Sequence, residues 1–395
     1  MRVLLATTAN NGHFGPMVPF ADACLRAGHD VLVAAPESFA GMVERAGHRH
    51  WPCPDVDPAE RAALHAKFLA AEPEKRNETM VTLGAELSAR SIMPGMLAAL
   101  DKWRPDVVLR EIGELGSAIA AELHGLPHVQ MLIGLDKFVD FTLPLAAQAL
   151  VPYRESLGLP GDPDGENLHR APSFSLLPPS LEMQRAQPGP QVHRFRMPAA
   201  SSDPLPRWWA NNDTPLVYAT FGTVAAGVPF AAAAFHTVVE ALADLPVRVL
   251  VTIGDSGDPS AWPALPPNVH VERWVPQQDV LTHAAAMVCH GGTGTVLGGL
   301  AAGVPMVVVP QFADQPDNAE RVAATGAGIS VGSGDTAPAT AEELRAAVTA
   351  VLTEPSYRKS AGAMAEEIAA LPPVDEAVSF LEQLTSAGHR PDPGN

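Results

Sequence analysis

The chain has 395 residues, too many for one ordinary core, and suits two domains of roughly 150–200 residues each. Its hydrophobic fraction of 47% is enough for a sizeable core, which excludes wholesale disorder. The net charge of −18 argues against nucleic acid or an anionic membrane as the main partner, because such binding needs a basic face. The net charge is still compatible with a small anionic ligand, since a few local groups can hold it.

The cysteines and the first residues indicate a cytoplasmic protein. Cys24, Cys53 and Cys289 are far apart and odd in number, which favours neither a disulfide framework nor a zinc site. The opening "MRVLLATTAN" has one basic residue and a short apolar run, so we expect a buried strand and not a signal peptide. We expect no membrane span, because no run of about 18 apolar residues without charges or breakers occurs.

Strand-like apolar runs alternate with helix-like segments in the first half, as in βαβ units with a parallel sheet. We predict strands at 2–8, 29–35, 105–111 and 127–134, and helices at 15–28, 37–47 and 116–125. The weakly periodic stretch 50–93 predicts helices over a cleft.

The second half repeats this alternation after residues 152–213, where the periodicity is lost. We predict a first domain over 1–196, a linker over 197–212, a second domain over 213–375, and a C-terminal helix and tail over 376–395. Two such domains suggest a ligand between them, at the carboxyl ends of the strands. In the second domain the predicted strands are 215–222, 247–254, 269–275, 286–292 and 304–310, and the predicted helices are 230–244, 277–285, 294–303, 316–327 and 340–354.

The segment "CHGGTGT" (289–295) joins a predicted strand to a predicted helix. Glycines let the backbone approach a ligand closely and adopt positive φ. The positive end of the following helix favours an anion, and His290 adds a donor, so the segment predicts a phosphate site. No Lys follows the glycines, so it is not a Walker A loop, and the spacing is not GxGxxG. The alternative is an ordinary glycine-rich turn with a buried histidine.

Two flanking segments suit a base and a sugar. In "RWVPQQDVL" (273–281), Trp274 or the backbone beside it could lie against a flat base, or Trp274 could belong to the core. In "PQFADQPDN" (310–318), Asp314 and Gln315 offer acceptors and donors for vicinal hydroxyls, although Asp314 could be a helix N-cap.

The segments "RWVPQ" and "HGGTGTVLGGLAAGVPMVVVPQFADQPDNAERV" resemble the donor signature of the GT-B glycosyltransferases of family 1, in their bacterial natural-product branch. "NNGHFGPMVPFADACLRAGHDVLVA" (10–34) is similar to the N-terminal motif of that family. The resemblance extends from residue 2 to about 375. It implies an α/β protein of GT-B fold, with two Rossmann-like βαβ domains whose parallel sheets face each other across a cleft.

The resemblance also implies residue roles. His13 matches the general base that acts on the acceptor hydroxyl, and Glu111 is the candidate that orients it, where the family more often has Asp. A turn histidine and a solvated loop carboxylate are the alternatives. The implied donor site comprises Thr220, Gly222, Thr223, His290, Gly291, Gly292, Thr293, Gly294 and Thr295 at the diphosphate, Asp314 and Gln315 at the sugar, and Trp274, Val275 and Gln277 at the base and ribose.

The predicted function is inverting, metal-independent transfer of a sugar from a nucleotide diphosphate sugar, by resemblance a dTDP-deoxysugar, to a hydroxyl of an antibiotic aglycone. No cofactor is expected, and no DxD-like acidic pair lies at a suitable strand end to bind a metal. A large apolar acceptor face is predicted from residues that could equally be core: Trp51, Phe68, Met80, Phe138 and Phe141.

Several alternatives stay open. They are a UDP-glucose-dependent enzyme of broad acceptor range, as in macrolide inactivation, and a nucleotide-sugar-binding protein without catalysis. An epimerase would need further acidic and basic groups, and an oxidoreductase would need a GxGxxG after the first strand, where "TTANNGHFG" has another spacing. The oligomeric state is also open, with a homodimer among the alternatives.

Overall fold

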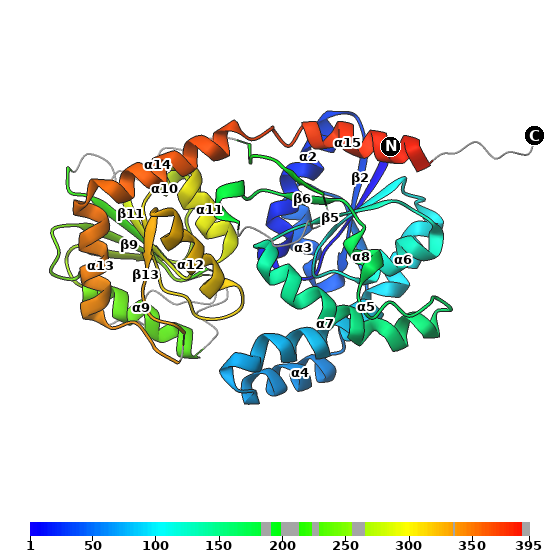
Figure 1. The fold of residues 1–395 in the computed structure, drawn as a ribbon, viewed down its shortest axis with the longest axis horizontal. Helices are drawn as coiled ribbons and strands as arrows, with labels where there is room; N and C mark the ends of the chain where they lie inside the picture. Colours follow the sequence, from blue (N-terminus) through cyan, green and yellow to red (C-terminus); the bar gives the residue numbers. More distant parts are fainter. Residues whose placement is uncertain (183–190, 199–212, 223–228, 255–264, 335, 389–395) are drawn as a thin grey trace, which may run out of the picture. The chain divides into compact units, whose positions relative to one another are not determined.

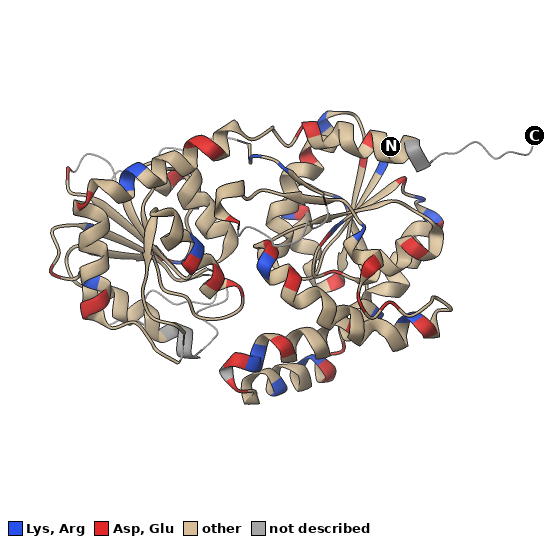
Figure 2. Cartoon of the chain, in the orientation of Figure 1, with Lys and Arg blue, Asp and Glu red and all other residues tan. Residues whose placement is uncertain are grey.

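The computed structural model describes residues 1–182, 191–198, 213–222, 229–254, 265–334 and 336–388 (Figure 1). The chain divides into two compact units. Unit 1 comprises Met1–Leu176, Gln184–Pro198 and Pro372–Asn395, and unit 2 comprises Leu177–Met183 and Ala199–Leu371. Of the predicted linker, residues 199–212 lie outside the described residues. Basic and acidic side chains are interspersed over the helices of both units (Figure 2).

Unit 1 contains a seven-stranded sheet in the order β3-β2-β1-β4-β5-β6-β7, with parallel pairing between the neighbours. Val3 to Ala6 of β1 are all fully buried, as expected for a parallel strand with helices on both faces. The strands are β1 (Arg2–Ala6), β2 (Asp30–Pro36), β3 (His50–Cys53), β4 (Val107–Glu111), β5 (His128–Met131), β6 (Ser173–Ser175) and β7 (Val192–Arg194).

Helices pack on both faces of this sheet. Leu4 and Val108 share a core cluster with Met96 of α5 and Ile119 of α6, whereas Phe20 of α2 stacks on Phe174 of β6 with ring centroids 5.4 Å apart. The helices are α1 (Asn11–Phe14), η1 (Gly15–Met17), α2 (Val18–Arg26), η2 (Glu37–Phe39), α3 (Ala40–Arg45), α4 (Pro58–Ala70), η3 (Pro73–Lys75), α5 (Arg76–Lys102), α6 (Gly116–His124), α7 (Asp136–Ser156), α8 (Glu166–His169) and α15 (Glu376–Gly388).

The C-terminal helix α15 belongs to unit 1, whereas the predicted boundaries kept residues 376–395 apart from both domains. The aromatic ring of Phe380 packs edge-on against Phe174, with centroids 5.5 Å apart. Glu382 lies 3.1 Å from His29, and just before the helix Asp375 pairs with Arg26 at 2.7 Å. These contacts attach α15 and the residue before it to α2, to β6 and to the turn before β2.

Unit 2 contains a six-stranded parallel sheet in the order β10-β9-β8-β11-β12-β13. Successive residues of β11 point to opposite faces. Val288 joins the core cluster with α9 and α13, and Met287 lies under Gly299 of α11. The strands are β8 (Leu216–Thr220), β9 (Arg248–Thr252), β10 (Val269–Glu272), β11 (Ala284–Cys289), β12 (Met306–Val308) and β13 (Gly328–Ser330). The helices are η4 (Pro179–Leu181), α9 (Pro229–Leu242), α10 (Gln277–Leu281), α11 (Thr293–Ala301), α12 (Gln315–Thr325), α13 (Ala341–Thr353) and α14 (Pro355–Ala370).

The segment Leu177–Met183 lies in unit 2, although the predicted first domain ran to residue 196. The Arg321 guanidinium of α12 donates to the carbonyl oxygens of Ser180, Leu181 and Glu182. Three hydrogen bonds from one side chain thus attach this segment to α12, a contact between positions far apart in the sequence.

The alternation of strands and helices is confirmed, but several short or proline-containing elements were not predicted. Strands β3, β6, β7 and β13 have only three or four residues, too few to show a period of two. Helix α7 continues through Pro144 and Pro152, and α14 starts with Pro355 at its first position, where proline is favoured.

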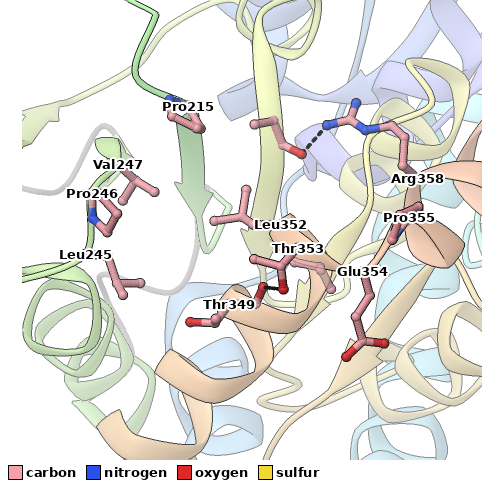
Figure 3. Close-up of a pocket in the computed structure, with 12 residues that line it drawn as sticks. Pro215, Leu245, Pro246, Val247, Thr349, Leu352, Thr353, Glu354, Pro355 and Arg358 are labelled. Atoms are coloured by element: carbon pink, nitrogen blue, oxygen red, sulfur yellow. Dashed lines mark hydrogen bonds between the residues drawn. The ribbon is translucent and has the colours of Figure 1, made fainter.

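A cavity of about 470 Å³ opens in unit 2 at the amino ends of its strands (Figure 3). Pro215 precedes β8, Val247 precedes β9, and Leu352 comes from α13. Arg358 of α14 donates to the Ala285 carbonyl oxygen at its rim. This cavity is therefore at the edge of the sheet opposite to the glycine-rich turn.

The close approach of α5 to β3 depends on Gly95, where an added Cβ would lie 2.5 Å from Cys53 Sγ and 2.7 Å from Cys53 Cα. We expect Gly95→Ala to destabilise the protein by about 1–3 kcal/mol through overpacking. Gly84→Ala in the same helix is the matched control, because its Cβ would meet Leu64 at an ordinary 3.5 Å and alanine favours helix by up to about 1 kcal/mol. The measurement is the urea midpoint of each variant, and an unchanged midpoint for Gly95→Ala would contradict the packing.

Candidate functional site

In unit 1 the sheet reverses its strand order between β1 and β4, the kind of position where ligands bind in doubly wound sheets. Ala6 pairs with Arg110, so Glu111 ends β4 directly beside the turn that follows β1. The Asn10 side chain accepts from the Gly12 N–H at 2.9 Å and caps α1, which carries His13. Two residues about a hundred positions apart in sequence therefore meet at this edge.

The His13 Nδ1 atom lies 3.2 Å from Glu111 Oε2, with His13 31% exposed and Glu111 fully buried. Burial favours the neutral carboxyl and would raise the pKa of Glu111. The charge of His13, together with hydrogen bonds from His13, the Gly113 N–H and Thr8, outweighs burial, so the pKa of Glu111 is lowered. A buried, ionised carboxylate thus holds one ring nitrogen of a histidine that reaches solvent.

A buried charge that the sequence did not predict lies behind this pair. The Arg110 guanidinium is fully buried and donates to Gln130 Oε1 at 2.8 Å and to the carbonyl oxygens of Glu111, Ile112 and Glu114 at 3.4 Å. Burial lowers the pKa of Arg110 to about 10, against the opposing effect of Glu114 and Glu111, so it stays cationic at neutral pH. The signal in the sequence was an Arg–Glu pair ending an apolar strand.

In unit 2 the strand order reverses between β8 and β11, and the glycine-rich turn follows β11 at this position. An added Cβ on Gly292 would lie 2.5 Å from His290 Nε2, and one on Gly222 would lie 2.9 Å from it. Both positions therefore require glycine so that the His290 ring can lie between the β8 and β11 turns. Gly222 and Gly291 also have positive φ, at 76° and 88°.

His290 is neutral at neutral pH in this structure. Burial lowers the pKa of His290 to about 4, and a hydrogen bond to the Thr220 backbone opposes this only in part. The buried Nδ1 has no partner among the described residues. His290 can therefore donate to a ligand as a neutral imidazole.

The turn leads into α11, whose N-cap Gly292 provides no side-chain cap. The first N–H groups of a helix lack partners within it, and the helix dipole makes this end positive. Thr293 and Gly294 supply these N–H groups, while the Thr295 N–H bonds to the Gly292 carbonyl at 2.9 Å. The arrangement suits an anion such as a phosphate.

Asp314 is joined to this turn by hydrogen bonds. Thr293 Oγ1 donates to Asp314 Oδ2 at 2.8 Å, and Asn318 Nδ2 lies 2.9 Å from the same oxygen. Asn318, which was absent from the predicted set, also donates to the Gly291 carbonyl at 2.8 Å and is almost fully buried. Asp314 occupies the N-cap position of α12, but its side chain makes no capping hydrogen bond there and bonds to Thr293 and Asn318 instead.

Gln315 organises the loop before α12. Its Oε1 accepts from the Gln311 N–H at 2.8 Å and the Phe312 N–H at 3.2 Å. Ala313 has a φ of 58°, which is strained for a residue with a Cβ. The loop that carries Asp314 is therefore held in a specific shape from within.

The residues predicted to contact the nucleotide base and ribose lie after β10. Trp274 is 61% exposed, so it is not a core residue. Val275 is half-buried, and the Gln277 amide of α10 lies against Gly298 of α11, where a Cβ would overlap it. Thr223 lies outside the described residues.

Comparison with known proteins identifies the family of the chain. A family model described as "Erythromycin biosynthesis protein CIII-like, N-terminal domain" matches residues 22–187, and the corresponding C-terminal domain matches 236–384. The 4'-demethylrebeccamycin synthase of Lentzea aerocolonigenes is 30% identical, over 97% of this chain and 99% of that protein. The chain belongs to the bacterial natural-product branch of the family 1 glycosyltransferases.

Solved structures give the same assignment. The glycosyltransferase VinC in complex with dTDP is 26% identical, with a TM-score of 0.77 over 98% of this chain and 100% of that one. The spinosyn rhamnosyltransferase SpnG complexed with spinosyn aglycone is 26% identical, with a TM-score of 0.81 over 97% and 100%. The two units of this glycosyltransferase are therefore the two α/β domains of a GT-B fold.

The predicted acceptor residues of the glycosyltransferase lie on four elements of unit 1. Trp51 of β3 packs on the core and donates from Nε1 to the Gly95 carbonyl at 2.9 Å. Phe68 of α4 has the Arg76 guanidinium 5.9 Å above its ring. Phe138 of α7 is half-buried, whereas Met80 of α5 and Phe141 of α7 are exposed.

Among the residues that the structure describes, no group of three or more His, Cys, Asp or Glu side chains could hold a metal ion. Within the same residues, no helix is both long enough and apolar enough to cross a membrane.

The lowered pKa of His290 makes stability depend on pH. Between about pH 6.5 and 4 the unfolded chain binds a proton at His290 that the folded chain does not, so this contribution is full above that range and is lost as pH falls. The slope for one proton is at most about 1.4 kcal/mol per pH unit. We expect His290→Gln to flatten the fall of the unfolding free energy over this range, measured by urea denaturation. His270→Gln, at an exposed histidine beside Glu272, is the control, and equal slopes in both variants would contradict the assignment.

Proposed function

We propose that this glycosyltransferase moves a sugar, with inversion, from a nucleotide diphosphate sugar to a hydroxyl of an apolar natural-product aglycone. The observation that carries the proposal is the pair of His13 and buried, ionised Glu111 beside a strand reversal. A dTDP-deoxysugar is the proposed donor, because VinC is bound to dTDP in its solved structure. The aglycone is proposed from the spinosyn aglycone bound to SpnG and from the antibiotic-forming relatives.

His13 is the proposed general base. Its ring is partly exposed, as a group that receives a proton from a bound alcohol must be. Glu111 stabilises the imidazolium that forms as the hydroxyl oxygen attacks the anomeric carbon. Because the attack comes from the face opposite to the leaving group, one displacement inverts the anomeric centre.

The glycine-rich turn is the proposed site of the leaving diphosphate. The N–H groups at the start of α11 and the neutral His290 ring are donors for its developing charge. Thr220 and Gly222 border the same position from the β8 turn. With these donors the proposed reaction needs no metal ion and no cofactor.

Asp314 is the proposed contact for the sugar hydroxyls, and Trp274, Val275 and Gln277 are the proposed neighbours of the base. Thr293 and Asn318 orient one oxygen of Asp314 and connect it to the diphosphate turn. Gln315 acts in this proposal by shaping the loop with its Oε1.

A UDP-glucose-dependent enzyme of broad acceptor range is the second candidate, since an aspartate beside a glutamine also suits a hydroxyl-rich hexose. A binding protein without catalysis would not need a histidine held by a buried carboxylate. The two enzymes differ in donor base and acceptor range, so donor binding separates them directly.

Nucleotide binding is tested by thermal stabilisation with dTDP, UDP and NAD. A ligand at a hundredfold excess over its dissociation constant stabilises the folded state by about 2.7 kcal/mol. We expect dTDP to give the largest shift, and His290→Ala to lose most of it. His270→Ala in the same unit should retain the shift, because its ring lies beside Glu272 at the surface. A larger shift with UDP would favour the second candidate, and a shift with NAD alone would overturn the donor site.

The role of His13 as general base is tested by sugar transfer from dTDP-glucose or UDP-glucose to macrolide and aromatic polyketide aglycones. The product is detected by mass spectrometry, with EDTA present. We expect His13→Gln to lower kcat by about 10²–10⁴-fold, the usual contribution of a general base. Its thermal shift with dTDP should be unchanged, because His13 belongs to unit 1 and the nucleotide turn to unit 2. Transfer that persists in His13→Gln, or that stops with EDTA, contradicts the corresponding part of the proposal.

A further inference from the structure

We propose that Thr8 is a positioning residue that fixes the ring tautomer of His13, an inference that rests on the proposed function. Thr8 lies in the turn after β1 and contacts both members of the pair. Its Oγ1 is 3.2 Å from His13 Nδ1 and 3.0 Å from Glu111 Oε1. No motif in the sequence singled out this threonine.

The direction of these hydrogen bonds follows from the ionisation of Glu111. An ionised carboxylate only accepts, so the single hydroxyl proton of Thr8 is donated to Glu111 Oε1. The Thr8 N–H donates to the same oxygen at 3.3 Å. The Thr8 hydroxyl oxygen then presents lone pairs, and not a proton, to the histidine.

Two acceptors therefore face the same ring nitrogen. His13 Nδ1 has Thr8 Oγ1 at 3.2 Å and Glu111 Oε2 at 3.2 Å. A lone pair on Nδ1 would be repelled by both oxygens, so the proton resides on Nδ1. The lone pair of the neutral ring is then on Nε2, and Nε2 is the atom that receives the proton of the acceptor hydroxyl.

Glycine at position 113 completes this arrangement. Its N–H donates to Glu111 Oε2, and a Cβ there would lie 3.1 Å from Glu111 Oε2 and 3.5 Å from His13 Cε1. One carboxylate oxygen is thus held by Thr8 and the other by Gly113, which fixes the carboxylate plane against the ring. Thr8 differs from Gly113 because it also reaches the ring itself.

The first test reads the tautomer directly from two-bond ¹⁵N–¹H correlation spectra of protein labelled at histidine. The His13 signals are assigned by their loss in His13→Gln. We expect wild-type His13 to be protonated at Nδ1 at neutral pH, and Thr8→Val to populate the Nε2-protonated form. A wild-type ring protonated at Nε2 overturns the proposal, whether or not the variant folds.

The second test is kinetic, with dTDP-glucose and the aglycone that gives the fastest wild-type transfer. We expect Thr8→Val to lower kcat about tenfold with little change in KM, because ring orientation matters in the transition state more than in binding. Thr8→Ser, which keeps the hydroxyl, should restore most of the lost rate. Thr385→Val is the matched control, because that hydroxyl bonds to the Glu382 carbonyl within α15.

The outcomes separate this inference from the proposed reaction. If Thr8→Val changes neither the tautomer nor kcat by as much as twofold, Thr8 has no positioning role. If the wild-type protein transfers no sugar to any aglycone but His13 is protonated at Nδ1 and Thr8→Val changes this, the proposed reaction fails and the tautomer assignment stands.

Discussion

The ionisation of Glu111 is the constraint on which the chemistry of unit 1 depends. A carboxylate without exposed surface is unstable unless charges and hydrogen bonds replace water. His13, Thr8 and Gly113 supply them on one side of β4, and Arg110 supports the same turn from within the core. Arg110 in turn depends on Gln130 of β5, so the pair at the surface rests on a polar network inside the sheet.

Unit 2 is subject to a different constraint, because its proposed site must leave space for a ligand beside the backbone. Its donors are backbone N–H groups and a neutral imidazole, and they are effective only if the backbone can come close to a ligand. Gly222 and Gly292 lie against the His290 ring where any Cβ would overlap it. The network of Thr293, Asp314 and Asn318 joins the turn after β11 to the loop after β12. The proposed diphosphate and sugar contacts therefore belong to one hydrogen-bonded structural element.

Much of this could be predicted from sequence, and the failures have physical causes. Long buried strands such as β1 and β8 were predicted because their apolar runs are continuous. Strands β6 and β7, of three residues each, carry no such pattern; β6 forms by pairing with β5, and β7 forms by pairing with β6. Helix α7 was missed because its two prolines interrupt the pattern, although packing on α5 maintains the helix.

The sequence by itself determined the α/β class and the glycine-rich turn, because these depend on local periodicity and on residue types at short spacing. The pairing of His13 with Glu111 was a candidate only through the resemblance to the family, since the two residues lie about a hundred positions apart. Only the tertiary structure decided which groups surround them. Thr8 and Glu111 are 103 positions apart, and Arg321 lies about 140 positions from the carbonyls that it binds. The first contact arises because the parallel strands β1 and β4 place their carboxyl ends at one edge, and the second because the segment Leu177–Met183 packs on α12. No local pattern encodes either contact. The tertiary structure also decided the protonation states of Glu111 and His290, because these depend on the burial and the hydrogen-bond partners that folding creates.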